Sequence, residues 1–511
     1  MRFTLINLIF SSVLFIAVAE QDQCNNADTS HTKKNGMTHS DQGGKGGKKN
    51  GSGGARKNSS QPDNTAVPNS TDNTNNSPSS ESVTGVWDIS TANQYKLNKK
   101  IHGTCIVAIN FFSARRSGSP ENNQIALNPY LALFDSLHWQ IVEWTGDASA
   151  HLNRLKVNDT TLRAGNGFNC TDCEAKNAAC CVPFGKDFFN ENLRLMKKTR
   201  IRNFDYTVNL SSGTIDEALW ACKNGATWLQ GELELSTKRH VDRWPNGQSY
   251  VKEWQAYIDA IHKQYPNVVF ESDAAPIWSN QPRDVEWNNA LTSLKGDGSK
   301  RMYLWDDDCF TATNDWNYNI SQINLAYDKT YPDRLRMMLS KFPGDSVNIA
   351  QWGMKNFQDP QLDNTMAGAH LIVKAYSLFE SMTMINHAFF MSMKQLIDKT
   401  MVPTNNYKIL VLAGKFVANS DMVVTTTLPD GLSGSVGVNG KTFYCLVSNQ
   451  TGGDRIYPDI NINGTGENVV YHQITYTAAS PGSMDFTRTT RNEKDILLKN
   501  NSVSLIYFTI P

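Results

Sequence analysis

The chain lacks a net charge, because 49 lysines and arginines balance 49 aspartates and glutamates over 511 residues. This balance offers no excess of positive charge for a nucleic-acid partner, and we expect none. A glycine-rich nucleotide loop, a haem-attachment motif and a convincing Ser/His/Asp arrangement are also missing, so no cofactor is expected. After residue 19 no apolar run reaches the ~20 residues that span a bilayer, and we expect no membrane span.

The amino terminus has the features of a secretory signal. Met1-Arg2 precedes a largely apolar run from Leu5 to Ala19, which closes on small residues. A basic start, an apolar centre and a small-residue end predict a signal peptide over residues 1–19, cleaved before Glu20. An uncleaved anchor is the alternative, but the run is short for a span. The chain is therefore expected to be secreted and extracellular.

Residues 20–84 contain very few large apolar side chains and are rich in Gly, Ser, Asn, Thr and Lys. Such a segment buries too little surface to offset the entropy of ordering, which predicts a disordered tail. Its basic residues are Lys33, Lys34, Lys45, Lys48, Lys49, Arg56 and Lys57. The tail is either a solvated linker or a polycation that binds an acidic matrix polyanion through salt-sensitive attraction.

Nine cysteines in a secreted chain predict disulfides. Four of them, Cys170, Cys173, Cys180 and Cys181, fall in one short polar stretch, which we interpret as a disulfide-stapled loop rather than a zinc site because no histidine is near. Further pairs are possible among Cys105, Cys222, Cys309 and Cys445. No metal site is predicted. N-glycosylation sequons, whose glycans must lie at the surface, begin at Asn58, Asn69, Asn75, Asn158, Asn169, Asn209, Asn319, Asn449, Asn463 and Asn500.

Residues 85–400 alternate between strand-like and helix-like segments. The strand-like runs are 105–111, 139–144, 203–210, 226–235 and 267–271, and the helix-like runs are 131–137, 187–198, 214–223 and 250–265. In the last helix the apolar residues Val251, Trp254, Tyr257, Ile258 and Ile261 recur at helical spacing. Repeated strand–helix units favour a parallel sheet, and there are enough of them for a (β/α)8 TIM barrel, an α/β fold.

Residues 401–511 contain short β-rich runs separated by Gly, Asn, Asp and Pro turns. These runs are 409–413, 422–427, 441–448, 469–477 and 502–510. Their spacing predicts a C-terminal β-sandwich domain. A strand from residues 85–97 is expected to pack with it.

Four motifs carry a resemblance to a family of enzymes. They are Val208-Asn209-Leu210-Ser211-Ser212-Gly213-Thr214, Gln230-Gly231-Glu232-Leu233, Gln351-Trp352-Gly353 and Asn501-Ser502-Val503-Ser504-Leu505-Ile506-Tyr507-Phe508. With the order of the domains, they resemble the retaining (β/α)8 glycoside hydrolases with a C-terminal β-sandwich, such as the heparanase, β-xylosidase and α-L-arabinofuranosidase families. The resemblance spans residues 86–511 and implies that Glu232 ends the fourth strand as acid/base and that Gln351 lies on the seventh.

The chain departs from this family at several site positions. A retaining glycosidase needs a second carboxylate to attack the sugar, and Gln351 is an uncharged amide in that place. The family's sugar-binding Asn before the acid/base is Gly231 here, its second-strand Arg is Glu143, and its sixth-strand His-x-Tyr is missing from residues 302–308. Together these departures predict a catalytically degenerate member.

Other acids leave an active enzyme open as the alternative. Glu143 or one of Asp306, Asp307 and Asp308 would serve as a base in an inverting arrangement with Glu232 as general acid. The acidic triple is otherwise a solvated turn or a Ca²⁺ site. Glu234 is the competitor of Glu232, because two positions along a strand face the same side.

Aromatic residues near strand ends indicate a sugar ligand, since flat rings stack on sugar faces, although burial in the core explains each of them equally well. They are Trp144, Trp228, Trp244, Trp278, Trp305 and Trp352. The expected substrate-binding residues are Glu143, Trp144, Asn209, Gly231, Trp305 and Trp352. We therefore expect a secreted protein with lost or impaired hydrolysis that binds a polysaccharide or glycoconjugate. A purely structural assembly protein, cross-linked through its tail or an odd cysteine, is a further alternative.

Overall fold

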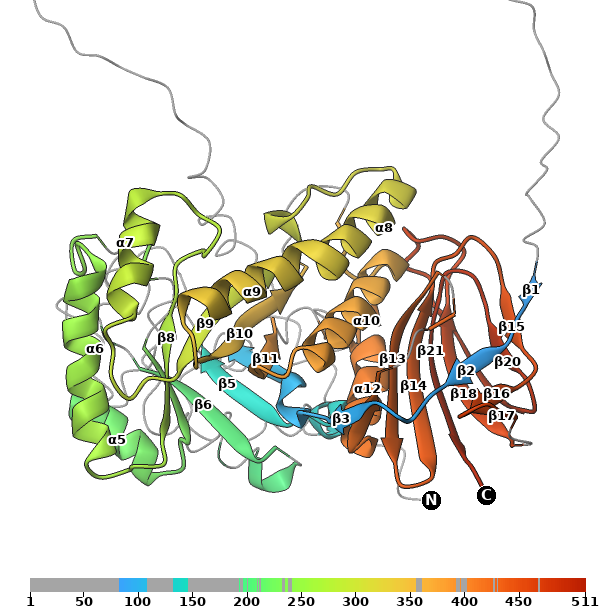
Figure 1. The fold of residues 1–511 in the computed structure, drawn as a ribbon, viewed down its shortest axis with the longest axis horizontal. Coiled ribbons are helices and arrows are strands. Elements are labelled where there is room, and N and C mark those ends of the chain that lie inside the picture. The colour runs from blue at the N-terminus through green and yellow to red at the C-terminus, as the bar shows by residue number, and fades with distance from the viewer. Residues whose placement is uncertain are drawn as a thin grey trace, which may run out of the picture.

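The computed structural model describes residues 82–107, 132–145, 193, 196–199, 201–208, 210, 213–231, 235–237, 241–354, 361–391, 396, 402–425, 428–429, 431–466 and 469–511. The predicted signal peptide, all but the last residues of the predicted tail and the four-cysteine loop lie outside these residues. Figure 1 shows the barrel and its surrounding helices at the left and centre. The stack of β-strands lies at the right.

Eight parallel strands close into a barrel, which confirms the predicted (β/α)8 architecture. The strands are β4 (Gly103–Val107), β5 (Ile141–Thr145), β6 (Asn203–Val208), β7 (Trp228–Gly231), β8 (Val269–Asp273), β9 (Ser299–Trp305), β10 (Ser346–Gly353) and β11 (Ile385–Phe390). β11 pairs with β4 to complete the circle. In chain order β7 is the fourth and β10 the seventh barrel strand, as the motifs predict.

Helices cover the barrel and follow its strands (Figure 1). Their bounds are η2 (Lys99–Ile101), α5 (Ile215–Lys223), α6 (Gly247–His262), α7 (Pro282–Leu291), η6 (Asp306–Asp308), α8 (Trp316–Leu325), η7 (Ala326–Thr330), α9 (Tyr331–Lys341), α10 (Met366–Ser381) and α12 (Asn405–Asn419). Residues 132–137 are also helical. Among the helices of the described ranges, none combines the length and the apolar character that a bilayer span requires.

Local sequence signals fix the ends of these helices. α5 begins with a capping box in which Thr214 accepts a hydrogen bond from the Glu217 backbone and the Glu217 side chain accepts one from the Thr214 backbone. α6 is capped by Asn246, whose side chain accepts a hydrogen bond from the Ser249 backbone, and the helix buries one apolar stripe. The predicted helices over 214–223 and 250–265 are thus confirmed with small shifts of their bounds.

Strands fill the carboxyl-terminal region. Their bounds are β12 (Met422–Val424), β13 (Leu432–Asn439), β14 (Thr442–Asn449), β15 (Arg455–Tyr457), β16 (Ile460–Ile462), β17 (Thr465–Gly466), β18 (Tyr471–Thr477), β19 (Thr487–Glu493), β20 (Ile496–Leu498) and β21 (Ser502–Thr509). Seven strands form one sheet in the order β19-β18-β21-β14-β13-β12-β3, and two three-stranded sheets accompany it. This arrangement confirms the predicted C-terminal β-sandwich.

Three short strands that precede the barrel belong to these sheets. β1 (Val83–Thr84) pairs with β15, β2 (Trp87–Ile89) with β16 and β3 (Gln94–Lys96) with β12. Trp87 is fully buried in the sandwich core with Phe443 and Phe508. The expectation that residues 85–97 pack with the C-terminal strands is correct for the strands within that range.

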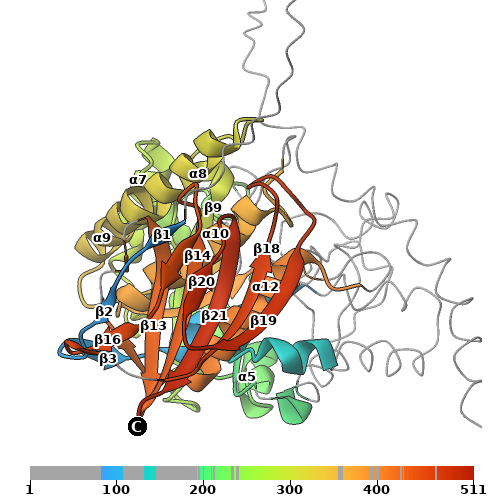
Figure 2. The same ribbon diagram turned by 90° about the vertical axis from the view of Figure 1, so that its right-hand side faces the viewer.

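The segment 409–413 is a helix, and the prediction of a strand there is wrong. It lies in α12, which is capped by Thr404, whose hydroxyl accepts a hydrogen bond from the Tyr407 backbone. α12 and α10 lie between the barrel and the seven-stranded sheet, as Figure 2 shows from the sheet side. A helix covered on two sides is apolar around most of its surface, and its sequence then looks like a buried strand.

The described cysteines are not paired with one another. Cys105, Cys222, Cys309 and Cys445 are free thiols, so the suggested pairs among them are wrong. Cys105 lies inside the barrel and Cys445 in the sandwich core. The four residues lie on different elements or loops of the described structure, and no two of their sulfur atoms are bonded to each other.

Two of the predicted sequons do not meet the requirement of surface exposure. Asn319 is fully buried and its side chain bonds both backbone groups of Thr313. Asn449 is also fully buried, and its amide nitrogen donates to the carbonyl groups of Gly453 and Leu498. Neither asparagine is open to a glycan in the folded chain.

Glu380 of α10 generates a prediction about pH, because it is buried beneath the sheet. Burial raises its pKa to about 8, although Ser435 opposes the rise. Between the ordinary value of 4.5 and about 8 the folded chain binds the extra proton, so its stability falls as pH rises. The variant Glu380→Gln has no ionisable group at this position, so this fall in stability with pH is absent. We expect it to be more stable than the parent at pH 8, by on the order of 3 kcal/mol, and similar at pH 5.

Thermal and urea unfolding at the two pH values measure this difference. The control is Glu493→Gln, an exposed residue of β19. An equal advantage of Glu380→Gln at both pH values would contradict the prediction.

Candidate active site

The carboxyl-terminal ends of the barrel strands, here called the barrel mouth, form the face where (β/α)8 enzymes bind substrate. β7 ends at Gly231, directly before Glu232. Glu232, its competitor Glu234 and Asn209 lie outside the described residues. The strand that leads to the predicted acid/base is therefore in place, and the position of its carboxyl group stays a prediction.

Gln351 faces the interior of the barrel because of a bulge in β10. Asn348 points inward, since its amide donates to Glu271 of β8. Strict alternation would turn position 351 outward, but the register with β9 shifts between Ile349 and Gln351 and pairs Gln351 with Tyr303. The extra residue brings Gln351 to the inner face, where it is 8% exposed. The amide thus occupies an inward position at the mouth end of the seventh strand.

Three other side chains share this end of the inner wall. Tyr303 and Trp305 alternate with Arg301 on β9 and so face the same side. The Tyr303 hydroxyl lies 3.3 Å from Oδ1 of Asp273, the last residue of β8. Trp305 is 5% exposed. The predicted Trp305 and Gln351 are therefore brought to neighbouring strand ends, together with Tyr303 and Asp273.

Asp273 is a mouth carboxylate that sequence reasoning missed. One oxygen lies 3.4 Å from the Arg301 guanidinium, and the other accepts from the Leu235 backbone at 3.1 Å. The latter contact ties Asp273 to the chain just beyond the predicted acid/base. A signal was present, because Glu271 and Asp273 alternate in a strand that is otherwise suited to burial.

Gly231 is not a vacant sugar-binding position. A Cβ atom there would lie 2.5 Å from the Tyr250 hydroxyl and 3.0 Å from the Trp254 ring, both on α6. Tyr250 also donates to the Gly231 carbonyl at 3.2 Å. Residue 231 therefore faces the helix layer, and the aromatic pair of α6 fills the volume that a side chain would need.

Glu143 is enclosed within the barrel rather than open at the mouth. It is fully buried, accepts from the Gln230 amide at 2.5 Å, and lies 2.6 Å from the Cys105 sulfur. Burial raises the pKa of Glu143 to about 7, although Cys105 and Arg301 oppose the rise. Burial, reinforced by Glu143, raises the pKa of Cys105 well above its usual range, so the group is a thiol that donates. Both Glu143 oxygens are engaged, which disfavours contact with a sugar.

The predicted aromatic residues are dispersed. Trp352 is fully buried on the outer side of β10 and packs against Tyr376, Phe379 and Phe390, so it does not line the mouth. Trp144 belongs to β5, and its side chain lies outside the described part.

The remaining tryptophans also have structural neighbours. Trp228 meets Lys100, which precedes the first barrel strand, and therefore lies toward the opposite end of the barrel. Trp244 donates to Glu253, and the Arg334 guanidinium covers Trp278 at 3.6 Å. For these positions the core-packing interpretation fits.

The acidic triple Asp306, Asp307 and Asp308 forms the short helix η6 directly after β9. Asp306 is 2% exposed, whereas Asp307 and Asp308 are exposed. The predicted solvated turn therefore fits Asp307 and Asp308, whereas Asp306 is buried.

A layer of charged groups below the mouth was not anticipated from the sequence. Asp205 of β6, Glu271 of β8, Arg301 of β9 and His387 of β11 are all fully buried. The His387 Nε2 atom lies 3.5 Å from Asp205 and 3.4 Å from Glu271. Burial and the neighbouring Glu271 raise the pKa of Asp205 well above its usual range. Burial also opposes ionisation of Glu271, but contact with His387 and Asp205 lowers its pKa below the ordinary value.

Several solved structures with a similar fold are glycoside hydrolases. An α-L-arabinofuranosidase from Thermotoga maritima in an arabinose complex aligns with a TM-score of 0.60 and 12% identity, over 83% of this chain and 99% of that one. A bifunctional glucanase-xylanase from a metagenome library gives 0.53 and 11%, over 84% and 100%. A monomeric β-xylosidase from Caulobacter crescentus gives 0.52 and 9%, over 83% and 99%.

No protein-family profile matches the chain, and no curated protein matches it in sequence. At such low identities the likeness concerns the fold. It confirms that the resemblance seen in the motifs reflects a shared barrel-plus-sandwich architecture.

Arg301 is the cation that balances the buried carboxyl groups, which leads to a prediction about stability. Removing one partner of a buried charge pair leaves an uncompensated charge, so we expect Arg301→Met to lower the free energy of unfolding by about 3–5 kcal/mol. The control is Arg336→Met, whose ion pair with Asp333 is exposed and is expected to contribute less than about 1 kcal/mol. Urea unfolding followed by circular dichroism measures both. A similar small loss in the two variants would mean that Arg301 does not hold the layer together.

Proposed function

We propose that this chain is an exported glycan-binding protein that keeps a glycoside-hydrolase fold but has lost, or strongly impaired, hydrolysis. One observation carries the proposal: the inner wall of the seventh barrel strand presents Gln351, an amide, at the barrel mouth. An amide has no negative charge to attack an anomeric carbon and no basic oxygen to activate water at neutral pH. With Glu232 as acid, one half of the carboxyl pair would be missing.

Surface chemistry at the mouth favours binding over bond cleavage. Tyr303 is half-buried there and combines an aromatic face with a hydroxyl group, and Trp305 follows it on the same side of β9. Aromatic rings contact the apolar faces of sugars, and neighbouring carboxyl and amide groups bind sugar hydroxyls. Gln351 supplies an amide of this kind. The neighbours named above as arabinofuranosidase, xylanase and β-xylosidase suggest pentose-containing glycans as the first ligands to try.

Export and the basic tail remain parts of the proposal that rest on the sequence. The apolar run from Leu5 to Ala19 supports secretion, and the lysines of the tail would add attraction to an acidic matrix polyanion. Binding through the tail should weaken with salt, whereas binding at the mouth should not depend strongly on it.

Asp273 favours one alternative, an active hydrolase with a non-standard second carboxylate. It is the last residue of β8, which pairs with β7, and it accepts a hydrogen bond from the backbone of Leu235, three residues beyond Glu232. Its two oxygens are already engaged by Arg301, Tyr303 and Leu235, which makes attack on a sugar or on water less favourable. The alternative nevertheless gives a distinct result in the experiment below.

Hydrolysis of aryl α-L-arabinofuranosides, aryl β-xylosides and the matching polysaccharides tests the proposal. We expect the parent chain and Glu232→Gln to give the same rate, because the parent has no productive carboxyl pair. Turnover by the parent that is lost in both Glu232→Gln and Asp273→Asn would overturn the proposal and support the alternative. The variant Gln351→Glu restores a carboxylate at this position. Hydrolysis by this variant alone would identify the amide as the reason that the parent chain is inactive.

Binding is measured separately by affinity electrophoresis in the same polysaccharides. Tyr303→Ala is expected to weaken retardation of the protein about tenfold, which corresponds to the loss of one aromatic contact of about 1.4 kcal/mol. Tyr318→Ala removes an exposed aromatic residue of α8 and serves as the control. Equal binding by both variants would place the ligand away from the mouth.

A further inference from the structure

Three side chains from separate strands converge inside the barrel. Asp205, Glu271 and His387 come from the third, fifth and eighth strands, and each is fully buried. One ligand-type atom from each lies within 4.8 Å of the others. This group, here called the barrel triad, combines one imidazole with two carboxyl groups, the donor types that bind zinc and related transition metals.

The barrel triad has more polar atoms than hydrogen bonds. Among the described residues, neither ring nitrogen of His387 and neither carboxyl oxygen of Asp205 has a hydrogen-bond partner other than the side chains of the triad itself. The same holds for Oε1 of Glu271 and Oδ1 of Asn348. Buried polar groups are nearly always satisfied, and each exception costs about 1–3 kcal/mol. Several such atoms in one fully buried cluster would be satisfied together by a bound ion.

The spacing within the barrel triad fits a shared ion better than direct hydrogen bonds. The Nε2 atom of His387 lies 3.5 Å from Asp205 Oδ2 and 3.4 Å from Glu271 Oε2, beyond the usual hydrogen-bond range. Two ligands of a tetrahedral zinc ion, each about 2.0–2.1 Å from the metal, are about 3.3–3.4 Å apart. Both measured separations are close to that value.

The balance between buried carboxyl groups and cations also favours a bound metal ion. Glu143, Asp205, Glu271 and Asp273 bring four carboxyl groups into the barrel interior, where Arg301 also lies. Arg301 pairs with Asp273 at 3.4 Å and also interacts electrostatically with Glu143, Asp205 and Glu271, so one guanidinium faces four carboxyl groups. A divalent ion beside His387 would compensate Asp205 and Glu271, whose oxygens lie within 3.5 Å of that imidazole.

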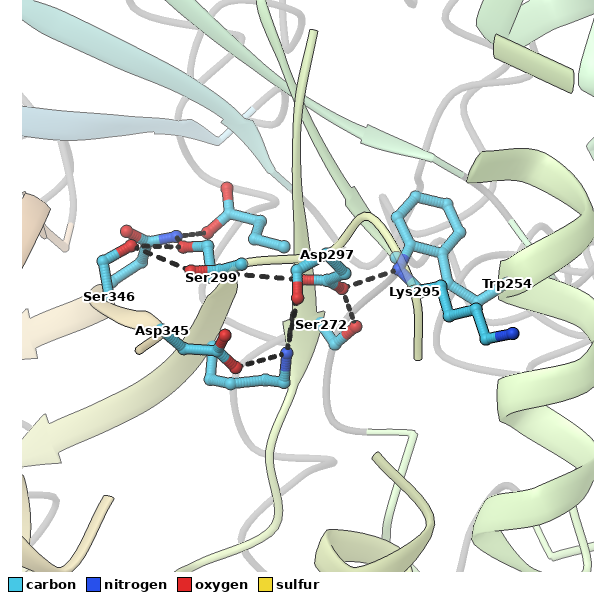
Figure 3. A network of polar contacts seen from close by, with 12 residues as sticks. Trp254, Ser272, Lys295, Asp297, Ser299, Asp345 and Ser346 are labelled. Atoms are coloured by element: carbon cyan, nitrogen blue, oxygen red, sulfur yellow. Dashed lines mark hydrogen bonds and ion pairs between the residues drawn. The ribbon is translucent and has the colours of Figure 1, made fainter. Parts of the chain in front are cut away.

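Surrounding residues hold the carboxylate of Glu271 in one orientation. The Asn348 amide donates to Glu271 and to the Ser299 hydroxyl. Ser299 in turn donates from its backbone to Asp297 at 3.1 Å. Figure 3 shows Asp297 at the centre of this network, with Ser272 and Trp254 directed toward it. Outer hydrogen bonds of this kind orient the ligands of protein metal sites.

We propose that the barrel triad binds one divalent transition-metal ion, with Zn²⁺ as the best match to its donors and spacing. Asp205, Glu271 and His387 are the protein ligands, and Asn348 is a positioning residue. Because the ligands come from three strands and are closed from solvent, the ion would be structural and would join opposite parts of the barrel wall. The competing arrangement is a proton shared by the carboxyl groups of Asp205 and Glu271 beside His387.

The first test measures the full chain as purified, without added metal. After dialysis against metal-free buffer, elemental analysis is expected to find about one equivalent of zinc, because a structural site releases its ion slowly and binding is coupled to folding. Removal with a strong chelator should lower the thermal midpoint, and Zn²⁺ should restore it. Replacement by Co²⁺ should give visible absorption bands in proportion to the ion bound, a readout that needs no variant.

Matched variants locate the ion. His387→Gln and Asp205→Asn are expected to lose the bound metal, and Asn348→Leu to weaken metal binding about 10–100-fold. His370→Gln is the control, since His370 is another fully buried histidine but bonds Asn324 and Ser448 outside the barrel. It should retain one equivalent.

Two results would overturn the proposal. In one, the parent chain retains less than about 0.1 equivalent of metal and neither Zn²⁺ nor Co²⁺ changes its thermal midpoint or spectrum, which would support the shared proton. In the other, metal persists in folded His387→Gln, which would mean that it binds elsewhere, for example on the histidines of the tail. If the variants fail to fold, the stoichiometry and cobalt spectrum of the parent chain decide.

Discussion

Charge inside a closed barrel is the constraint that connects the features of this protein. Barrel strands turn alternate residues inward, and here many of those positions carry ionisable side chains instead of the branched apolar residues typical of the fold. Arg301, with contacts to Asp273, lies among carboxyl groups that water does not reach. Because isolated buried charges are very unfavourable, each carboxyl group must find a cation, a proton or a hydrogen-bond donor within the barrel.

The buried carboxyl groups are compensated in different ways along the barrel axis. Glu143 is satisfied by donors, since Gln230 and the Cys105 thiol both reach it. Asp273, at the strand end, combines Arg301, Tyr303 and a backbone amide. Between them, the barrel triad has one described amide donor, Asn348, and its nearest atoms are spaced as ligands of a common ion would be. The interior therefore shows three different ways of burying an acid, and only the third calls for a partner from outside the chain.

Much of the fold was predictable from the sequence because its signals are local. Helices such as α5 and α6 have capping residues and one apolar stripe, and the strands before them are bounded by turns. α12 was mistaken for a strand because it is covered by the barrel and by the sheet. β13 and β19 were missed, since the first is rich in Gly and Ser and the second is largely polar and exposed. A helix or strand can be predicted from a single sequence when one of its faces is buried and the other is exposed.

The candidate site depends on geometry that a single sequence does not contain. Motif spacing identified Gln351 and the strands that carry it, but a bulge determines that its side chain faces inward. The barrel triad comes from strands distant in the chain, and its convergence follows from barrel closure and register, not from any local pattern. Asp273 was overlooked for the same reason, since its role arises from contact with Arg301, Tyr303 and Leu235.

The amide at position 351 is consistent with this electrostatic arrangement. Gln351 is in register with Tyr303, whose hydroxyl contacts Asp273, the partner of Arg301. A glutamate at 351 would add another negative charge near a guanidinium that already pairs with an acid. Active-site carboxylates are costly to stability, and a protein that no longer needs one gains by replacing it with a neutral isostere. Under the proposed function, glycan binding at the mouth requires no charge at position 351, whereas the buried acids below it still have to be compensated.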